Sequence, residues 1–325
     1  MTIGNHLQDF HGLPAFDFPA EPREPKDVAQ LPAADAVAWR IAVEPYGDDD
    51  EEWTARFARF ADTVDLSQVR ALIVGVWGEA YENGPERVIE ALVGVRDRLT
   101  ALRAVFLGDI VMEEAEISWI YQGRVTDVLE AFPALEEFGV RGGTDLSFSP
   151  IRHEALRRLV IETGGMPAAA VRGVAASDLP ALVHLDLWLG TPEYGGDADI
   201  DDLAPIFSGV RLPALRHLSL CNSVLQDAIC AAVAAAPVVA RLDSLDLSMG
   251  VLTDEGASAL LTGQPLTHLS SLDLSHNYIS GKLLTRLRET LEPAGVQLDL
   301  DHGGAEFDED EDADGNQWRF VAVGE

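Results

Sequence analysis

A short pattern of apolar positions, L-x-x-L-x-L with other apolar residues as substitutes, recurs along most of the chain. Its last two apolar residues alternate with polar ones, as in a short, half-buried strand. Successive copies start 21 to 33 residues apart, a period typical of solenoid proteins. We therefore expect one strand per copy, each stacked on its neighbour. The copies are Leu102-Val105-Leu107, Leu135-Phe138-Val140, Leu156-Leu159-Ile161, Leu182-Leu185-Leu187, Leu215-Leu218-Leu220, Leu242-Leu245-Leu247 and Leu269-Leu272-Leu274, with degenerate copies at Val69-Leu72-Val74 and Val296-Leu298-Leu300.

Stretches with helical spacing follow the later copies of the pattern. Residues 280 to 291 place their leucines on one face of a helix. Another helix is expected just after Thr253 or Asp254, either of which is suited to an N-cap. The predicted fold class is thus α/β: a solenoid with parallel strands on the concave face and helices on the convex face.

Two segments carry a resemblance to a known repeat type. Leu272-Asp273-Leu274-Ser275-His276-Asn277-Tyr278-Ile279 resembles the ribonuclease-inhibitor-type leucine-rich repeat, including its asparagine. Leu245-Asp246-Leu247-Ser248, followed by the segment from Leu252 to Ala257, is similar to the same consensus. Most other copies have glycine near the asparagine position, at Gly164, Gly190 or Gly250, so a regular asparagine ladder is not expected.

The opening of the chain carries a second resemblance. Met1-Thr2-Ile3-Gly4-Asn5-His6-Leu7, His11-Gly12-Leu13-Pro14 and Phe16-Asp17-Phe18-Pro19 are similar to an uncharacterised family of bacterial leucine-rich-repeat proteins. The repeat resemblance covers residues 69 to 300 and implies the fold. It does not specify a function, because this fold serves many binding roles.

The ends of the chain divide it into three predicted regions. Residues 1–65 are expected to hold an irregular, proline-rich segment across the first repeat, then a strand at 36–43 and a helix at 51–61 that cap the solenoid. Residues 66–300 form the solenoid, and residues 301–325 an acidic loop followed by a terminal strand at 318–323. A separate catalytic domain is not expected, because no nucleophile or phosphate-loop pattern occurs.

The charge balance narrows the classes of partner. There are 55 acidic and 23 basic residues, a net charge of −32. Proteins that bind nucleic acid or anionic lipid need clusters of cations, so neither partner is expected. A basic protein partner and plain solubility both remain open. No apolar run approaches the roughly 20 residues of a membrane span, and the N-terminus does not resemble a signal peptide. We therefore expect a cytoplasmic protein.

Two constellations suggest chemistry only weakly. Asp310, Asp312, Asp314 and Gly315 match the opening of a calcium-binding EF-hand loop, but Val321 stands where the bidentate glutamate should be. An acidic surface loop is the simpler interpretation of residues 308–314. Histidines and a cysteine near one another on neighbouring strands also allow a nucleophile or a zinc site, yet their spacing supports neither. We therefore expect no catalytic residue, no metal and no cofactor.

The concave face is the predicted binding surface. Asp246, Asp273 and Asp299 should form a file of carboxylates on adjacent strands, which repel one another unless a cation meets them. Aromatic residues at Trp77, Phe106 and Trp188 would project towards the same side or belong to the core. The candidate partner-binding residues are His184, Asp186, Trp188, His217, Cys221, Asp246, Asp273, Asp299, Arg141 and Arg158.

These patterns favour a non-catalytic interaction protein. We expect it to grip a partner protein with a basic surface in its curved groove, and the inhibitor-type repeats suggest regulation of an enzyme. The alternative is an accessory protein that holds a peptide or small-molecule intermediate for a partner enzyme.

Overall fold

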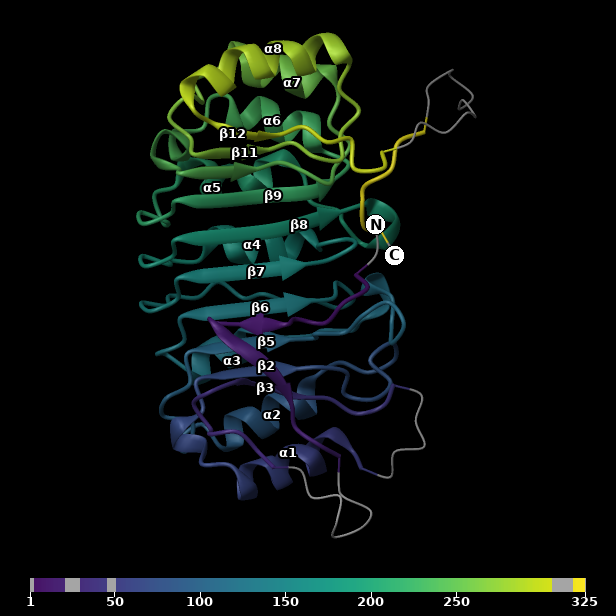
Figure 1. Ribbon diagram of the computed structural model, residues 1–325, viewed down its shortest axis with the longest axis vertical. Coiled ribbons are helices and arrows are strands. Elements are labelled where there is room, and N and C mark those ends of the chain that lie inside the picture. Colours follow the sequence, from purple (N-terminus) through teal and green to yellow (C-terminus); the bar gives the residue numbers. More distant parts are fainter. Residues whose placement is uncertain (1–2, 21–29, 46–50, 306–317, 325) are drawn as a thin grey trace.

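The computed structural model describes residues 3–20, 30–45, 51–305 and 318–324. They form one 12-stranded sheet whose strands follow sequence order, with helices along one side (Figure 1). Only the β1–β2 pair is antiparallel. This arrangement fits a repeat solenoid. The strands are β1 Asp9–Phe10, β2 Leu13–Asp17, β3 Ala38–Ile41, β4 Ala71–Val74, β5 Ala104–Leu107, β6 Glu137–Arg141, β7 Arg158–Glu162, β8 His184–Gly190, β9 His217–Ser223, β10 Ser244–Asp246, β11 Ser271–Asp273 and β12 Gln297–Asp299.

The helices lie on one side of the sheet, and we call the opposite side the helix-free face. The α-helices of the described part of the chain are α1 Trp53–Thr63, α2 Glu86–Gly94, α3 Thr126–Ala131, α4 Ala168–Ala176, α5 Ala204–Ser208, α6 Gln226–Val233, α7 Asp254–Thr262 and α8 Gly281–Leu291. The helix expected after Thr253 is α7, and the Thr253 hydroxyl accepts a hydrogen bond from the Glu255 N–H as predicted for an N-cap. No helix of the described residues is long and apolar enough to cross a membrane.

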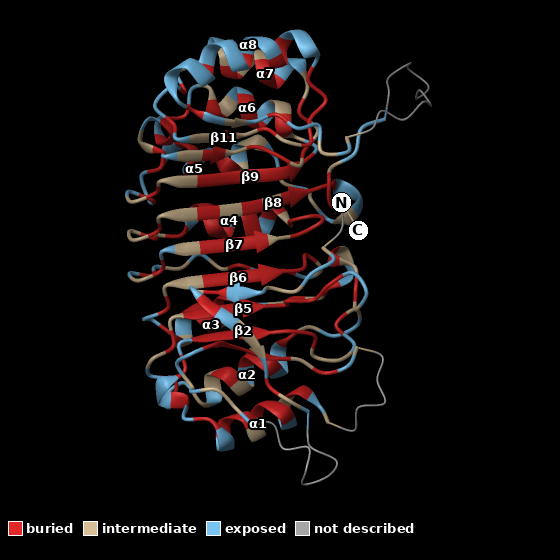
Figure 2. Ribbon diagram, in the orientation of Figure 1, coloured by how far each residue is buried: buried red, intermediate tan, exposed pale blue. Residues whose placement is uncertain are grey.

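The predicted apolar positions build the core between sheet and helices. Leu185, Leu218, Leu245 and Leu272 are in register on four consecutive strands, and all are buried. In Figure 2, buried residues lie on the strands and on the helices along the length of the sheet. Because side chains alternate along a strand, the residues between the leucines lie on the helix-free face. The leucine pattern therefore positions the candidate site.

The N-terminal segment differs from the irregular structure expected for residues 1–35. β1 and β2 form a hairpin, and β2 continues as a parallel edge strand beside β3. His11 and Gly12 both have positive φ, 53° and 70°, which is the backbone of a tight two-residue hairpin turn. The predicted strand and helix that follow are present as β3 and α1, while their role as a cap stays a prediction.

The C-terminal segment also corrects an expectation, since residues 318–324 contain no strand. They run along the ends of the strands (Figure 1) and form no strand pair with the described residues. Instead, the Asn222 side chain bonds both the N–H and the carbonyl of Val323 at 2.9 and 2.6 Å. The Ala322 N–H donates to the Met249 carbonyl at 2.8 Å. The loop at 308–314 lies outside the described residues.

Candidate functional site on the helix-free face

Strand register arranges the polar side chains of the helix-free face in two rows. Glu137, Arg158, His184, His217 and Ser244 stand side by side at the starts of five strands, and we call them the histidine row. Two residues further along, a second row holds Asp186, Ser219, Asp246, Asp273 and Asp299, which we call the acidic row. The predicted file of three aspartates on adjacent strands is thus present.

The three aspartates of that file are held by the same local hydrogen bond. Asp246 accepts from the Ser248 N–H at 2.9 Å, and Asp273 accepts from the Ser275 N–H at 2.8 Å. Asp299 accepts from the Asp301 N–H at 2.9 Å. Aspartate readily bonds its own backbone two residues on, which explains the repeated Leu-Asp-Leu-Ser motif. This bond fixes each carboxylate and uses only one of its oxygens in each case.

The acidic row is crowded with like charges. Burial, and then the charge of Asp246, raise the pKa of Asp186 to about 7. Burial also raises the pKa of Asp273, with Asp246 and Asp299 adding to the effect. Within the described residues, no arginine, lysine or histidine forms an ion pair with any aspartate of the row. The row therefore carries negative charge that no ion pair within the described residues neutralises, and the charge of Arg158 offsets only part of the rise in the pKa of Asp186.

The histidine row has a different character. The rings of His184 and His217 lie 5.8 Å apart between centroids, and His217 Nδ1 lies 2.7 Å from Ser244 Oγ. Burial, together with the charge of Arg158 and the neighbouring His217, lowers the pKa of His184 to about 4. His184 is therefore neutral at physiological pH. A cavity of about 400 Å³ lies at this end of the strands, bordered by both histidines.

Trp188 on β8 and Cys221 on β9 lie two residues beyond the acidic row, and they pair in register. Trp188 is partly exposed, whereas Cys221 is buried, with 1% of its surface exposed. Burial, and then the charges of Asp186 and Asp246, raise the pKa of the Cys221 thiol well above its usual value. A cysteine nucleophile needs a lowered pKa, so this environment is the opposite of an activating one.

The helix-free face of β3 to β5 is apolar and is covered by the N-terminal hairpin (Figure 1). Phe10 packs edge-on against Phe106, with ring centroids 5.9 Å apart. Small residues on three adjacent strands let the hairpin approach closely: Ala38, Ala71 and Ala104. Phe106 thus faces the predicted side but lies under the hairpin. Trp77 packs partly buried against the core, and its indole N–H donates to the Asn83 carbonyl.

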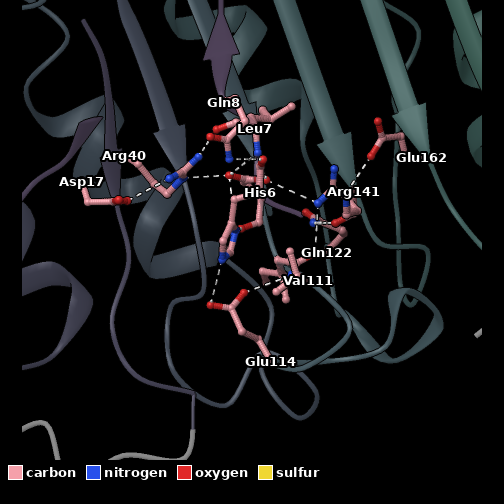
Figure 3. Close-up of polar contacts among 12 residues, drawn as sticks. His6, Leu7, Gln8, Asp17, Arg40, Val111, Glu114, Gln122, Arg141 and Glu162 are labelled. Atoms are coloured by element: carbon pink, nitrogen blue, oxygen red, sulfur yellow. Dashed lines mark hydrogen bonds and ion pairs between the residues drawn. The ribbon is translucent and has the colours of Figure 1, made fainter. Parts of the chain in front are cut away.

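A buried ion cluster around Asp109 fixes the hairpin (Figure 3). Asp109 follows β5 and has 0% of its surface exposed. It lies 2.8 Å from Arg40 Nε and 3.4 Å from Arg141 Nη1, and it accepts a 3.1 Å hydrogen bond from the Leu7 N–H. Burial by itself would raise the pKa of Asp109. The hydrogen bond with His6 and the charges of Arg40 and Arg141 outweigh it, so the pKa lies below the usual value.

Most of the candidate residues, those from Arg158 to Asp299, lie together on the helix-free face of β7 to β12. Arg141 is separated from them. Arg141 has 4% of its surface exposed and is held by Asp109 and by Glu162 at 2.7 Å. Arg158, by contrast, stands beside His184 in the histidine row. Sequence reasoning missed Asp109, Arg40, His6 and the hairpin's role in covering the face. The sequence signal that could have indicated the hairpin is Gly12, directly after His11 and between two short apolar runs, because glycine favours tight turns.

No cluster of three or more histidine, cysteine, aspartate or glutamate side chains with metal-binding geometry occurs among the residues the structure describes. The EF-hand-like loop lies in the part that is not described.

Comparison with solved structures identifies a similar fold. A protein from Bacteroides fragilis, whose crystal structure was determined in a structural genomics programme, superimposes with a TM-score of 0.75 and 26% sequence identity. The match covers 87% of this chain and 76% of the other. No protein-family model matches the chain, and no curated protein does. The likeness supports the repeat architecture and assigns no activity.

Proposed function

We propose that the protein is a non-catalytic interaction module that binds a basic segment of a partner protein on the helix-free face of β8 to β12. In this proposal the solenoid is a leucine-rich-repeat protein of ribonuclease-inhibitor type, the helix-free face is its concave side, and the protein is cytoplasmic. Regulation of an enzyme through this contact follows from the same resemblance.

The uncompensated acidic row is the observation that carries the proposal. The charge of Asp246 raises the pKa of Asp186 and of Asp273, while the charge of Arg158 lowers that of Asp186 without forming an ion pair with it. Lysine or arginine side chains of a partner would remove this repulsion on binding. The net charge of −32 would also attract a basic partner over a distance.

Trp188 and the histidine row border the acidic row and would widen the contact. Aromatic residues are enriched among the residues that contribute most to interfaces. Neither Cys221 nor Arg141 enters the proposed surface directly, because both are buried. Cys221 supports the row from below through Ser219, whose hydroxyl lies 3.5 Å from the Cys221 sulfur and 3.1 Å from Asp246 Oδ2.

The test compares capture of cytoplasmic proteins by the wild type and by a variant with Asp246→Lys and Asp273→Lys. The matched control, Glu255→Lys with Glu289→Lys, makes the same charge change at exposed positions on helices α7 and α8. We expect a partner that is retained by the wild type and the control, lost by the row variant, and released by added salt. If all three folded proteins capture the same set, the proposed surface is wrong.

A further inference from the structure

The cavity at the starts of β6, β7 and β8 concentrates basic side chains in a strongly acidic protein. It has a volume of about 400 Å³, and Arg157, Arg158, His184 and His217 border it together with His11 from the hairpin turn. The surrounding chain has 55 acidic and 23 basic residues. This local excess of basic groups lies two residues before the acidic row on the same strands.

The two carboxylates at the cavity are already matched by cations. Glu137 lies 3.1 Å from Arg158 Nε and 3.1 Å from His11 Nδ1. Glu136 lies 3.7 Å from Arg103 Nε. Arg157 is exposed and forms no ion pair with any residue that the structure describes. The unmatched charge of the cavity is therefore the positive charge of Arg157.

The two histidines add hydrogen-bonding capacity that the protein leaves unused. His184 Nε2 is buried and has no hydrogen-bond partner among the described residues. Buried polar atoms are nearly always paired, and because His184 borders the cavity, a ligand there that displaces the ring slightly would satisfy this atom. His217 engages Ser244 through Nδ1, which leaves its Nε2 for another contact.

We propose that this cavity is a binding site for a carboxylate group, which Arg157 and the imidazoles of His184 and His217 hold. A guanidinium presents two parallel N–H groups that match the two oxygens of a carboxylate. The volume lies within the range of about 300 to 1,000 Å³ that small-ligand sites occupy. The carboxylate belongs either to a small organic acid or to the C-terminus of a peptide, since both present the same group.

Binding would change the protonation of His184. Its neighbours on the adjacent strands are Arg158 and His217, and the charge of Arg158 opposes protonation. Asp186 lies two residues along on its own strand, and Glu137 is occupied by Arg158 and His11. A bound carboxylate adds a negative charge close to the ring, so the pKa of His184 should rise from about 4.

The experiment follows the imidazole nitrogens of His184 and His217 by NMR in the purified full chain, so it needs no partner protein. The probes are succinate, tri-alanine with a free C-terminus, tri-alanine amide and inorganic phosphate, at matched ionic strength. Arg157→Ala is compared with Arg211→Ala, which removes another exposed arginine that does not border the cavity. His217→Asn serves as a second variant should Arg157→Ala fail to fold.

We expect succinate or free tri-alanine, or both, to shift both histidine signals saturably and to raise the pKa of His184. Succinate alone identifies a small acid as the ligand, and free but not amidated tri-alanine identifies a chain terminus. Arg157→Ala should weaken binding at least about tenfold, which is the scale of one charge-assisted hydrogen bond, whereas Arg211→Ala should leave it unchanged. Binding of phosphate alone, equal effects of the two arginine variants, or no saturable shift overturns the proposal.

Discussion

The pKa of an aspartate is shifted in opposite directions in the two halves of the helix-free face. At the N-terminal end, Asp109 lies among Arg40, Arg141 and His6, and its pKa is lowered. At the C-terminal end, Asp186 lies near Asp246 without a cation partner, and its pKa is raised to about 7. The first carboxylate belongs to an arrangement that is complete within the chain. The second forms no ion pair with any residue that the structure describes.

The same contrast holds for the surfaces around them. The hairpin covers the apolar face of β3 to β5, where Phe10 packs on Phe106. From β8 onward, the acidic row of the described structure has no such cover (Figure 1). One half of the helix-free face is therefore covered by the chain's own hairpin, and the other half is left open.

Removing the Asp109 charge tests whether the buried ion cluster stabilises the N-terminal half of the helix-free face. It should have the largest effect on stability. Asp109→Asn leaves Arg40 and Arg141 without their shared anion in a buried site, which should lower the free energy of unfolding by about 3 to 5 kcal/mol. Denaturant unfolding measures this change. Asp17→Asn is the control: Asp17 pairs with the same Arg40 but is 74% exposed, so its loss should cost less than about 1 kcal/mol. Equal losses would show that burial of the cluster is unimportant.

Truncating Phe10 should loosen the hairpin that covers the N-terminal half of the helix-free face. Phe10→Ala removes a buried ring from the contact with Phe106 and should cost about 3 kcal/mol. Hydrogen exchange at Leu13–Asp17 should accelerate, because β2 loses the packing that holds the hairpin down. Trp119→Ala, at an aromatic residue that is 58% exposed, should change stability by no more than about 0.5 kcal/mol. Unchanged exchange in Phe10→Ala would show that the hairpin is held by the ion cluster alone.

Asp186 should make the stability of the protein depend on pH. Its folded pKa, about 7, exceeds the ordinary value of 3.8, so the folded state holds a proton that the unfolded state has lost. Its contribution to stability therefore falls as the pH rises from about 4 to 7. Asp186→Asn should remove this fall and raise the free energy of unfolding at pH 8 by up to about 4 kcal/mol, the equivalent of the difference between a pKa of about 7 and one of 3.8. Unfolding curves from pH 4 to 8 measure it; a wild type and variant that differ equally at every pH would argue against the raised pKa.

The smallest effect is expected at the outer end of the acidic row. Asp299→Asn removes one of the charges that raise the pKa of Asp273, so that pKa should fall slightly. The effect should shrink in 0.5 M salt, where the screening length is only about 4 Å. NMR titration of the Asp273 carboxyl carbon gives both values. A fall that persists in high salt would point to a rearrangement rather than to charge repulsion.

The repeated strands and the acidic row were predictable because a local pattern determines both. Each Leu-Asp-Leu segment places its leucines in the core and its aspartate on the other face, and parallel stacking then brings Asp246, Asp273 and Asp299 into line. The Asn277 side chain donates to the carbonyls of Leu274 and Leu300 and so links two neighbouring repeats.

Long-range contacts account for what the sequence did not reveal. The Asp109 cluster joins His6, Arg40 and Arg141, which are separated by up to 135 positions and share no motif, 141 − 6 being 135. The strand expected at 318–323 was wrong because alternation describes side chains and does not show whether a partner edge is free. Arg141 and Arg158 look alike in sequence, and only their neighbours make one a buried ion-pair partner and the other part of the open face.

The path of residues 318–324 has a consequence for how the molecule unfolds. In a linear repeat array each unit contacts only its neighbours, so the ends can fray while the middle stays folded. Here the Phe320 carbonyl accepts from the Tyr278 hydroxyl at 3.0 Å, Val323 bonds Asn222, and the Ser118 hydroxyl donates to the Gly324 carbonyl. One short segment thus joins units separated by 160 positions along the chain, 278 − 118 being 160. Fraying of one of these units breaks contacts with the others, which makes the loss of structure more cooperative than the repeat architecture alone would allow.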